Sequence, residues 1–295
     1  MSFTILDTAN TYRKMLAAGS NAERTEIFRH EIAVPFEGLV RTMGGQDTMA
    51  MLKMWGMFPE QFEGAHAAQM QDRLETLLAA KAWEQTVQAL EDGMKAFEGS
   101  AVAERRVVFG LMLADLSAAP SQRGYSGFGA IPGWIMTVYG TPDAYNLHRI
   151  KACTAHELHH NIWRRIFPTN MMTWTLGEYM IMEGLAESFA QELYGEDTIG
   201  FWVTDFDMTQ MPSVKQQFAE ALEVTGFNVI RGYIFGDEFA GDQYGIQRMG
   251  VPTFAGYALG YHVVQAYLRR TGKRVVEATF VPAQEIIQQS AFFSN

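Results

Sequence analysis

The chain has 295 residues, 48% of them hydrophobic and 19% charged, which is ordinary for a globular protein with one large domain or two smaller ones. Its net charge of −10 argues against nucleic acids and anionic membranes as partners, because both would need a basic surface. No apolar run approaches the roughly 18 residues of a membrane span, and the first residues lack the pattern of a secretion signal, so we expect a cytoplasmic protein.

The first hundred residues are predicted to be helical, because apolar residues recur at intervals of three and four. Helices are expected at 6–18, 22–43, 48–57 and 65–97. We therefore predict an N-terminal helical region at 1–100 and a second domain at 101–295, with one compact unit as the alternative.

The character of the chain changes after residue 105. Segments 106–113 and 134–139 are rich in β-branched and aromatic residues and are predicted to be strands. Between them, residues 124–133 contain four glycines and one proline, which indicates a loop. Helices are then expected around residue 156, at 175–194 and at 254–271. The predicted fold class is α+β and predominantly helical, with a small β-sheet.

The run His156-Glu157-Leu158-His159-His160 is an HExxH motif in a helical segment. His156 and His160 lie one turn apart on one helix face, so both imidazoles can reach one metal ion. Glu157 lies beside them, where its carboxylate can act as general base toward a water molecule. The pattern is typical of zinc hydrolases with two histidine ligands and one open coordination position. His159 faces away and is expected to be packed or hydrogen-bonded.

A third ligand is expected from Glu183-Gly184-Leu185-Ala186-Glu187, which begins 23 residues after His160. Glu183 is the preferred ligand, and Glu187, one turn later, could orient a ligand histidine through a hydrogen bond. Gly184 is expected to let this helix approach the HExxH helix closely. Glu178, 18 residues after His160, is a rival ligand.

These motifs resemble the gluzincin metallopeptidases, whose HExxH is followed by a downstream glutamate, often at a shorter spacing than here. More closely, they resemble the DUF2268 family of predicted zinc-dependent proteases, the group that includes the YjaZ proteins of Bacillus. The matching runs are His156 to Asn161, Glu183 to Glu187 and Gly256 to Tyr261. The resemblance implies a zincin-like metallopeptidase domain, one zinc ion per chain, and a peptide or protein substrate.

In zincins an edge strand near the metal pairs with the extended substrate. By this resemblance, segment 134–139 is a candidate for the edge strand, and an interior strand is the alternative. Peptide hydrolysis also passes through an oxyanion that a hydroxyl or an N–H can stabilise. Tyr257, Tyr261 and His262, on the predicted C-terminal helix, are the candidates for this role, although tyrosines at helical spacing often belong to the core.

Two other classes of function compete with a peptidase. Glu63 with His66, and Glu157 with His160, are ExxH pairs, and with Glu37 and Glu91 they could form a ferritin-like di-iron oxidoreductase site. This alternative explains neither His156 nor Glu183. A non-catalytic metal-binding protein is the third possibility, but a purely structural site would need no Glu157. The single Cys153 excludes an intrachain disulfide and is expected to be a buried thiol. The residues contain no signal for a particular oligomeric state.

Overall fold

The computed structural model describes residues 2–100, 106–117, 122–241 and 245–294. The chain forms two compact units, Met1–Asn161 and Ile162–Asn295, each of which is described by itself. This division differs from the predicted boundary at residue 100. The reason is that the first strand, β1 (Ser2–Ile5), pairs with β2 (Arg106–Leu113), which ties the N-terminal helices to the sheet in one unit.

The first unit is built on a four-stranded mixed sheet in the order β1-β2-β4-β3. The predicted strands are confirmed as β2 and β4 (Trp134–Tyr139), which run parallel to each other. Strand β3 (Tyr125–Phe128) lies inside the segment predicted to be a loop, and it pairs antiparallel to β4. Consequently β4 has a neighbour on both sides, and the expectation that it forms the edge is wrong. The edge strand beside it is β3.

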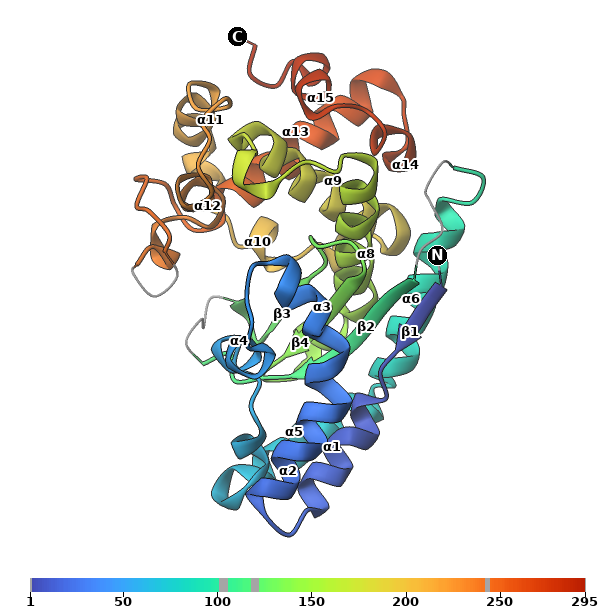
Figure 1. Cartoon of the computed structure of the whole chain (residues 1–295). Helices are drawn as coiled ribbons and strands as arrows, with labels where there is room; N and C mark the ends of the chain where they lie inside the picture. The colour runs from blue at the N-terminus through green and yellow to red at the C-terminus, as the bar shows by residue number, and fades with distance from the viewer. Residues whose placement is uncertain (1, 101–105, 118–121, 242–244, 295) are drawn as a thin grey trace. The chain divides into compact units, whose positions relative to one another are not determined.

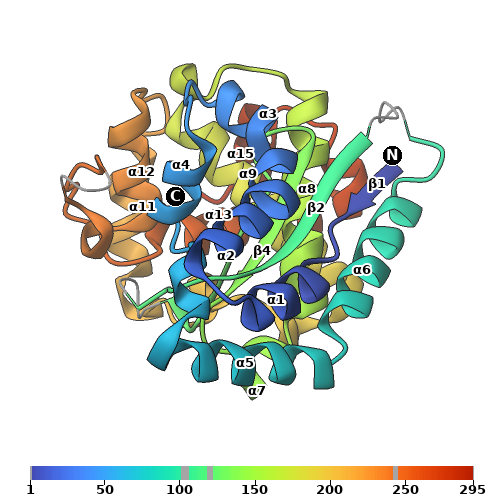
Figure 2. The ribbon, with the colours of Figure 1, turned by 60° about the horizontal axis from the view of Figure 1, so that its bottom comes forward.

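Helices α1 (Thr8–Ala17) and α3 (Val34–Thr42) lie over one face of the sheet (Figure 2). The indole N–H of Trp134 donates to the carbonyl of Pro35 in α3 (3.0 Å), and the Tyr12 hydroxyl of α1 lies 3.7 Å from the sulfur of Met112. Trp134 and Met112 therefore lie on the face that these helices cover. Residues on strands alternate between faces, so Tyr139 and Thr137 point the opposite way, toward α8 (Ile150–Ile166). This arrangement places the sheet directly under the HExxH helix.

The N-terminal helices follow the predicted segments, with two interruptions. A π-helical turn (Arg29–Ala33) divides segment 22–43, and Lys81, in the left-handed region at φ 54°, divides segment 65–97. The helices before β2 are α1 (Thr8–Ala17), α2 (Asn21–Phe28), α3 (Val34–Thr42), α4 (Thr48–Met54), α5 (Gly64–Ala79) and α6 (Ala82–Ala96), and a short α7 (Ala144–Leu147) precedes α8 (Figure 1).

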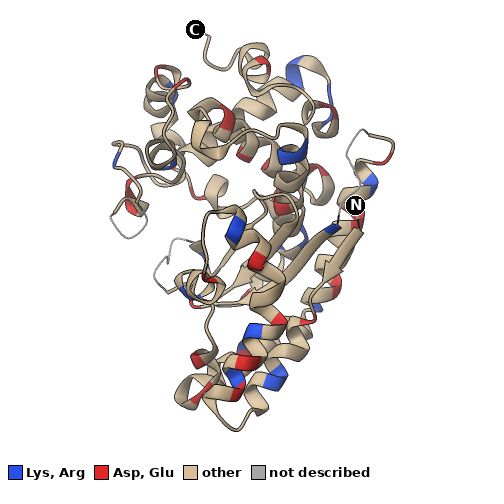
Figure 3. Ribbon diagram, viewed as in Figure 1, with Lys and Arg blue, Asp and Glu red and all other residues tan. Residues whose placement is uncertain are grey.

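Charged residues of both signs share the helices of the first unit (Figure 3). Lys14 of α1 lies 2.6 Å from Glu31, and Arg29 lies 3.1 Å from Glu26. Acidic and basic side chains are therefore interleaved on these helices rather than gathered by sign.

The second unit is helical in its described residues. Its helices are α9 (Leu176–Tyr194), α10 (Phe201–Thr204), α11 (Met211–Ala219), α12 (Phe227–Phe235), α13 (Ala255–Thr271), α14 (Val275–Ala278) and α15 (Ala283–Ser290). Within the described part of the chain, no helix combines the length and the apolar character that a bilayer span needs. The fold class is thus α+β and predominantly helical, as predicted.

Two glycines set the distance between α9 and α13. A Cβ atom on Gly184 would collide with the carbonyl of Gly260 and lie 2.9 Å from the amide nitrogen of Tyr261, and a Cβ on Gly260 would collide with the carbonyl of Met180. Gly184 therefore lets α9 approach α13, and the expectation that it faces the HExxH helix is wrong. Neighbouring helical residues point about 100° apart, so a glycine next to Glu183 cannot share the direction of that side chain.

Candidate metal centre

Helix α8 presents the two histidines of the motif from a buried position. His156 and His160 are 3% and 4% exposed. Their ring centroids are 4.6 Å apart and the rings are nearly perpendicular. The one-turn spacing predicted from sequence thus brings both imidazoles to the same place on the helix surface.

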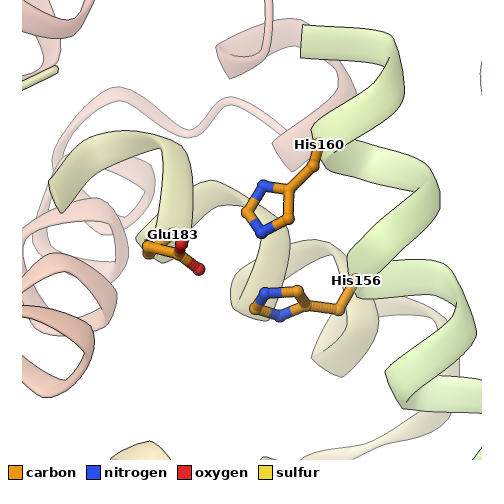
Figure 4. A group of neighbouring side chains, drawn as sticks. All are labelled: His156, His160 and Glu183. Carbon is orange, nitrogen blue, oxygen red and sulfur yellow. The ribbon is translucent and has the colours of Figure 1, made fainter. Parts of the chain in front are cut away.

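Glu183 of α9 completes a group of three possible ligands (Figure 4). One ligand atom from each of His156, His160 and Glu183 lies within 4.8 Å of the others, and all three residues are buried. Two imidazole nitrogens and one carboxylate oxygen are a donor set that suits zinc and leaves a coordination position open. The residues present therefore fit the metal that the motif implies.

The rival ligand Glu178 has a different task at the start of α9. Its carboxylate accepts a hydrogen bond from the main-chain N–H of Thr175 (2.9 Å), while the Thr175 hydroxyl accepts one from the N–H of Glu178 (3.1 Å). This reciprocal pair is a capping box, which stabilises a helix N-terminus. The Thr-x-x-Glu pattern that encodes it is visible in the sequence and already favours Glu183 as the ligand.

Glu157 lies against strand β3. The side chain is 6% exposed, and its Cγ and Cδ are 2.6 Å and 2.7 Å from the place where a Cβ of Gly127 would lie. Just after the strand, Gly129 is equally close to the main chain of Glu157, 2.9 Å from its Cα by the same construction. The glycine-rich segment thus provides a flat backbone surface under the carboxylate that was predicted to act as general base.

Asn161, the residue after the motif, holds the segment between β3 and β4 on α8. Its amide nitrogen lies within hydrogen-bonding distance of the carbonyl oxygens of Gly129 (2.9 Å), Ile131 (3.0 Å) and Trp134 (3.0 Å), and its oxygen accepts from the N–H of Gly133 (3.0 Å). Asn161 is fully buried. The sequence carries no local signal for this clamp, because Asn161 lies 32 residues after Gly129.

Glu187, the predicted partner of a ligand histidine, has two hydrogen-bond donors in its own unit. One carboxylate oxygen accepts from the N–H of Gly200 (2.6 Å) and the other from the indole N–H of Trp202 (2.6 Å). The residue is 2% exposed. These bonds fix the carboxylate in place and hold α10 beside α9. A further bond from Glu187 to a ligand histidine stays a prediction.

The three oxyanion candidates lie on α13 in different surroundings. Tyr257 packs among aromatic rings, including those of Trp202 and Phe235. The Tyr261 hydroxyl donates to Gln191 of α9 (2.9 Å), and burial, followed by the charges of Glu187 and Glu196, raises the pKa of Tyr261 to about 12. Tyr261 is therefore a protonated donor at neutral pH.

His262 differs from the tyrosines in its electrostatics. Burial, followed by the charge of Arg269, lowers the pKa of His262, so its imidazole is neutral at neutral pH. Tyr261, whose pKa responds to the charge of Glu187, is the candidate with a link to the acidic residues of α9.

The remaining candidates occupy structural positions. His159 is fully buried beside Phe97, with ring centroids 6.3 Å apart, as expected of a packed histidine. Cys153 is a buried thiol whose sulfur lies 3.8 Å from the carbonyl oxygen of Ser126. In the described ranges, the one group of three or more possible ligands is that of His156, His160 and Glu183. Of the residues that the di-iron alternative needs, His160 lies in this group, whereas Glu37, Glu63, His66 and Glu91 belong to no such group in the same ranges.

Comparisons with known proteins identify the family of the chain. The model of the family described as "Predicted Zn-dependent protease (DUF2268)" matches residues 82–288. The uncharacterized protein YjfC of Bacillus subtilis (strain 168) is 34% identical over 306 residues that cover all of both chains. No solved structure matches, so the zincin-like fold stays a prediction. The extent of the family match shows that the chain belongs to the DUF2268 family of predicted zinc-dependent proteases.

Proposed function

We propose that this chain is a zinc-dependent peptidase in which His156, His160 and Glu183 bind the metal and Glu157 is the general base. The observation that carries the proposal is the convergence of these three ligands, with their donor atoms within 4.8 Å of one another. The family description, which names a zinc-dependent protease, supports the same reaction class.

A zinc ion bound by this donor set would supply a Lewis acid that polarises a peptide carbonyl and makes a water molecule more acidic. Glu157 would accept a proton from that water as it attacks and would then give the proton to the leaving amine. The carboxylate follows His156 directly in the chain and is buried, which supports this role. An adjacent base that binds no metal is what separates a hydrolytic site from a structural one.

Strand β3, rather than segment 134–139, is the edge strand with which an extended substrate would pair. The Gly140 N–H donates to the carbonyl of Gly124 (2.8 Å), which identifies Gly124 and Gly140 as a hydrogen-bonded pair of the antiparallel ladder. In such ladders these pairs alternate with others whose main-chain groups point outward. The main-chain N–H and C=O groups of Tyr125 and Gly127 therefore point away from β4. A peptide extended along this edge would lie beside Glu157.

Metal analysis of the purified chain tests the proposal. We expect one zinc per chain, hydrolysis of a casein or peptide substrate, and loss of that hydrolysis when a chelator removes the zinc. Tightly bound zinc without hydrolysis would favour a non-catalytic metal-binding protein, and two irons per chain would favour the di-iron alternative.

A further inference from the structure

Strand β3 lies so close to α8 that position 127 has no room for a side chain. A Cβ atom on Gly127 would lie 2.6 Å from Cγ and 2.7 Å from Cδ of Glu157, and closer still to Oε1. Real Cβ atoms essentially never approach another heavy atom to less than 3.0 Å, so one of the two residues would have to move. The atoms in the way belong to the side chain of Glu157 and not to its backbone.

We propose that Gly127 is a positioning residue for the Glu157 carboxylate, which can lie in its present place because residue 127 has no side chain. The proposal rests on the proposed function, since it assumes that Glu157 is the base. Gly127 touches neither the metal ligands nor the reacting atoms through a side chain, and it acts by leaving space.

The surroundings of Glu157 explain why the position of the carboxylate depends on Gly127. The side chain is 6% exposed, so it cannot escape a methyl group at position 127 by turning into solvent. It would adopt another buried rotamer, or the strand would separate from the helix. A base displaced by about 1 Å can lose about 10²-fold in rate.

Gly129 provides a contrast in the same segment. A Cβ there would collide with the carbonyl oxygen of Glu157 and lie 2.7 Å from the carbonyl carbon, and these atoms belong to the main chain of α8. The Asn161 amide donates to the carbonyl of Gly129 and so keeps Gly129 next to the main chain of α8. Gly129 therefore sets the separation of strand segment and helix, whereas Gly127 leaves space for one side chain.

A stability cycle tests the contact without any assay of activity. The melting temperature is measured for the parent, Gly127→Ala, Glu157→Ala and the double variant. We expect Gly127→Ala to lower the melting temperature by about 2–8 °C. The same substitution should cost little in the Glu157→Ala background, because the colliding atoms are gone. Gly129→Ala is the matched control, and Glu157→Ala should leave its cost unchanged because the colliding atoms are main-chain atoms.

Turnover tests the consequence for catalysis. Gly127→Ala should keep its zinc, change KM little, and lower kcat by about 10- to 100-fold. Gly19→Ala, whose Cβ would meet only an ordinary contact at 3.8 Å, controls for the loss of a glycine and should keep the parent kcat.

The outcomes separate this inference from the proposed function. If the parent hydrolyses peptides and zinc-loaded Gly127→Ala does so at the same rate, the positioning role is overturned while the peptidase assignment stands. If the parent hydrolyses nothing, the proposed function fails, and the stability cycle alone decides the contact. Equal costs of Gly127→Ala in the parent and in the Glu157→Ala background would then overturn it.

Discussion

Helices α8 and α9 both bury ionisable side chains, yet they fix them in different ways. On α8, His156, Glu157 and His160 fall within five consecutive residues, and the helix rests on glycines of the segment that contains β3. On α9, Glu178, Glu183 and Glu187 spread along the helix and each has its own partners. The ionisable residues of α8 are thus consecutive or one turn apart, whereas those of α9 are spread over several turns.

The difference teaches that spacing identifies the residues of α8 but not those of α9. Helical spacing alone does not assign the roles of Glu178, Glu183 and Glu187, and their partners distinguish them. Glu178 caps the helix, Glu183 joins the histidines, and Glu187 binds Gly200 and Trp202. Substitutions of the three glutamates along α9 can therefore separate helix capping, metal binding and the support of α10.

The largest effect on α9 is expected at Glu183. Glu183→Ala should lose most of its zinc on dialysis, and with it the activity, because two histidines alone hold zinc weakly. Glu178→Ala is the matched control on the same helix. It should keep its zinc and lose only about 1 kcal/mol of stability with the capping box. A zinc-poor Glu178→Ala with a zinc-loaded Glu183→Ala would reverse the assignment.

The next effect is expected at Tyr261 on α13. Tyr261→Phe should lower kcat by about 10²- to 10³-fold, the usual cost of losing one oxyanion donor. Zinc content should not change, and the loss of the bond to Gln191 should cost about 1 kcal/mol of stability. Tyr257→Phe and His262→Ala, measured beside it, should have smaller effects on kcat. If Tyr261→Phe retains full turnover, the oxyanion donor is another residue.

A smaller effect is expected at Glu187. Glu187→Ala should weaken zinc binding by about 10- to 100-fold, as the loss of a group that orients a ligand usually does. It should also change the fluorescence of Trp202, whose indole N–H loses its acceptor. Glu192→Ala, which removes a surface ion pair with Arg274 from the same helix, should change neither quantity. Unaltered zinc affinity in Glu187→Ala would leave it only a structural role.

The smallest effect on catalysis is expected at Gly184. Gly184→Ala should lower the melting temperature by several degrees, because its Cβ would meet the backbone of Gly260, while kcat per folded, zinc-loaded molecule stays near that of the parent. Gly177→Ala should be milder, because its Cβ would lie 3.1 Å from the tip of Ile287 and 3.3 Å from the carbonyl oxygen of Leu222, and neither distance is below 3.0 Å. Equal melting temperatures for both variants would contradict the close crossing of α9 and α13.

The sequence contained enough to predict the long helices and to select the candidate metal ligands, because helical periodicity and the HExxH spacing are local signals. It did not predict β3, since two of the four residues, Ser126 and Gly127, have little preference for strands. The strand conformation of β3 depends on pairing with β4, the next strand, and on the Asn161 clamp, which lies 32 residues after Gly129. The same limit applies to Gly184, whose neighbour Gly260 lies on another helix.

The substitution Glu157→Gln tests the central claim most directly. The amide keeps the size of the side chain beside Gly127 but cannot accept the proton, so the variant should keep one zinc per chain and lose about 10²- to 10⁴-fold in turnover. Zinc content and hydrolysis of the same peptide are measured on one preparation. A zinc-loaded Glu157→Gln that cleaves the peptide at the parent rate would contradict the assignment of Glu157 as the base.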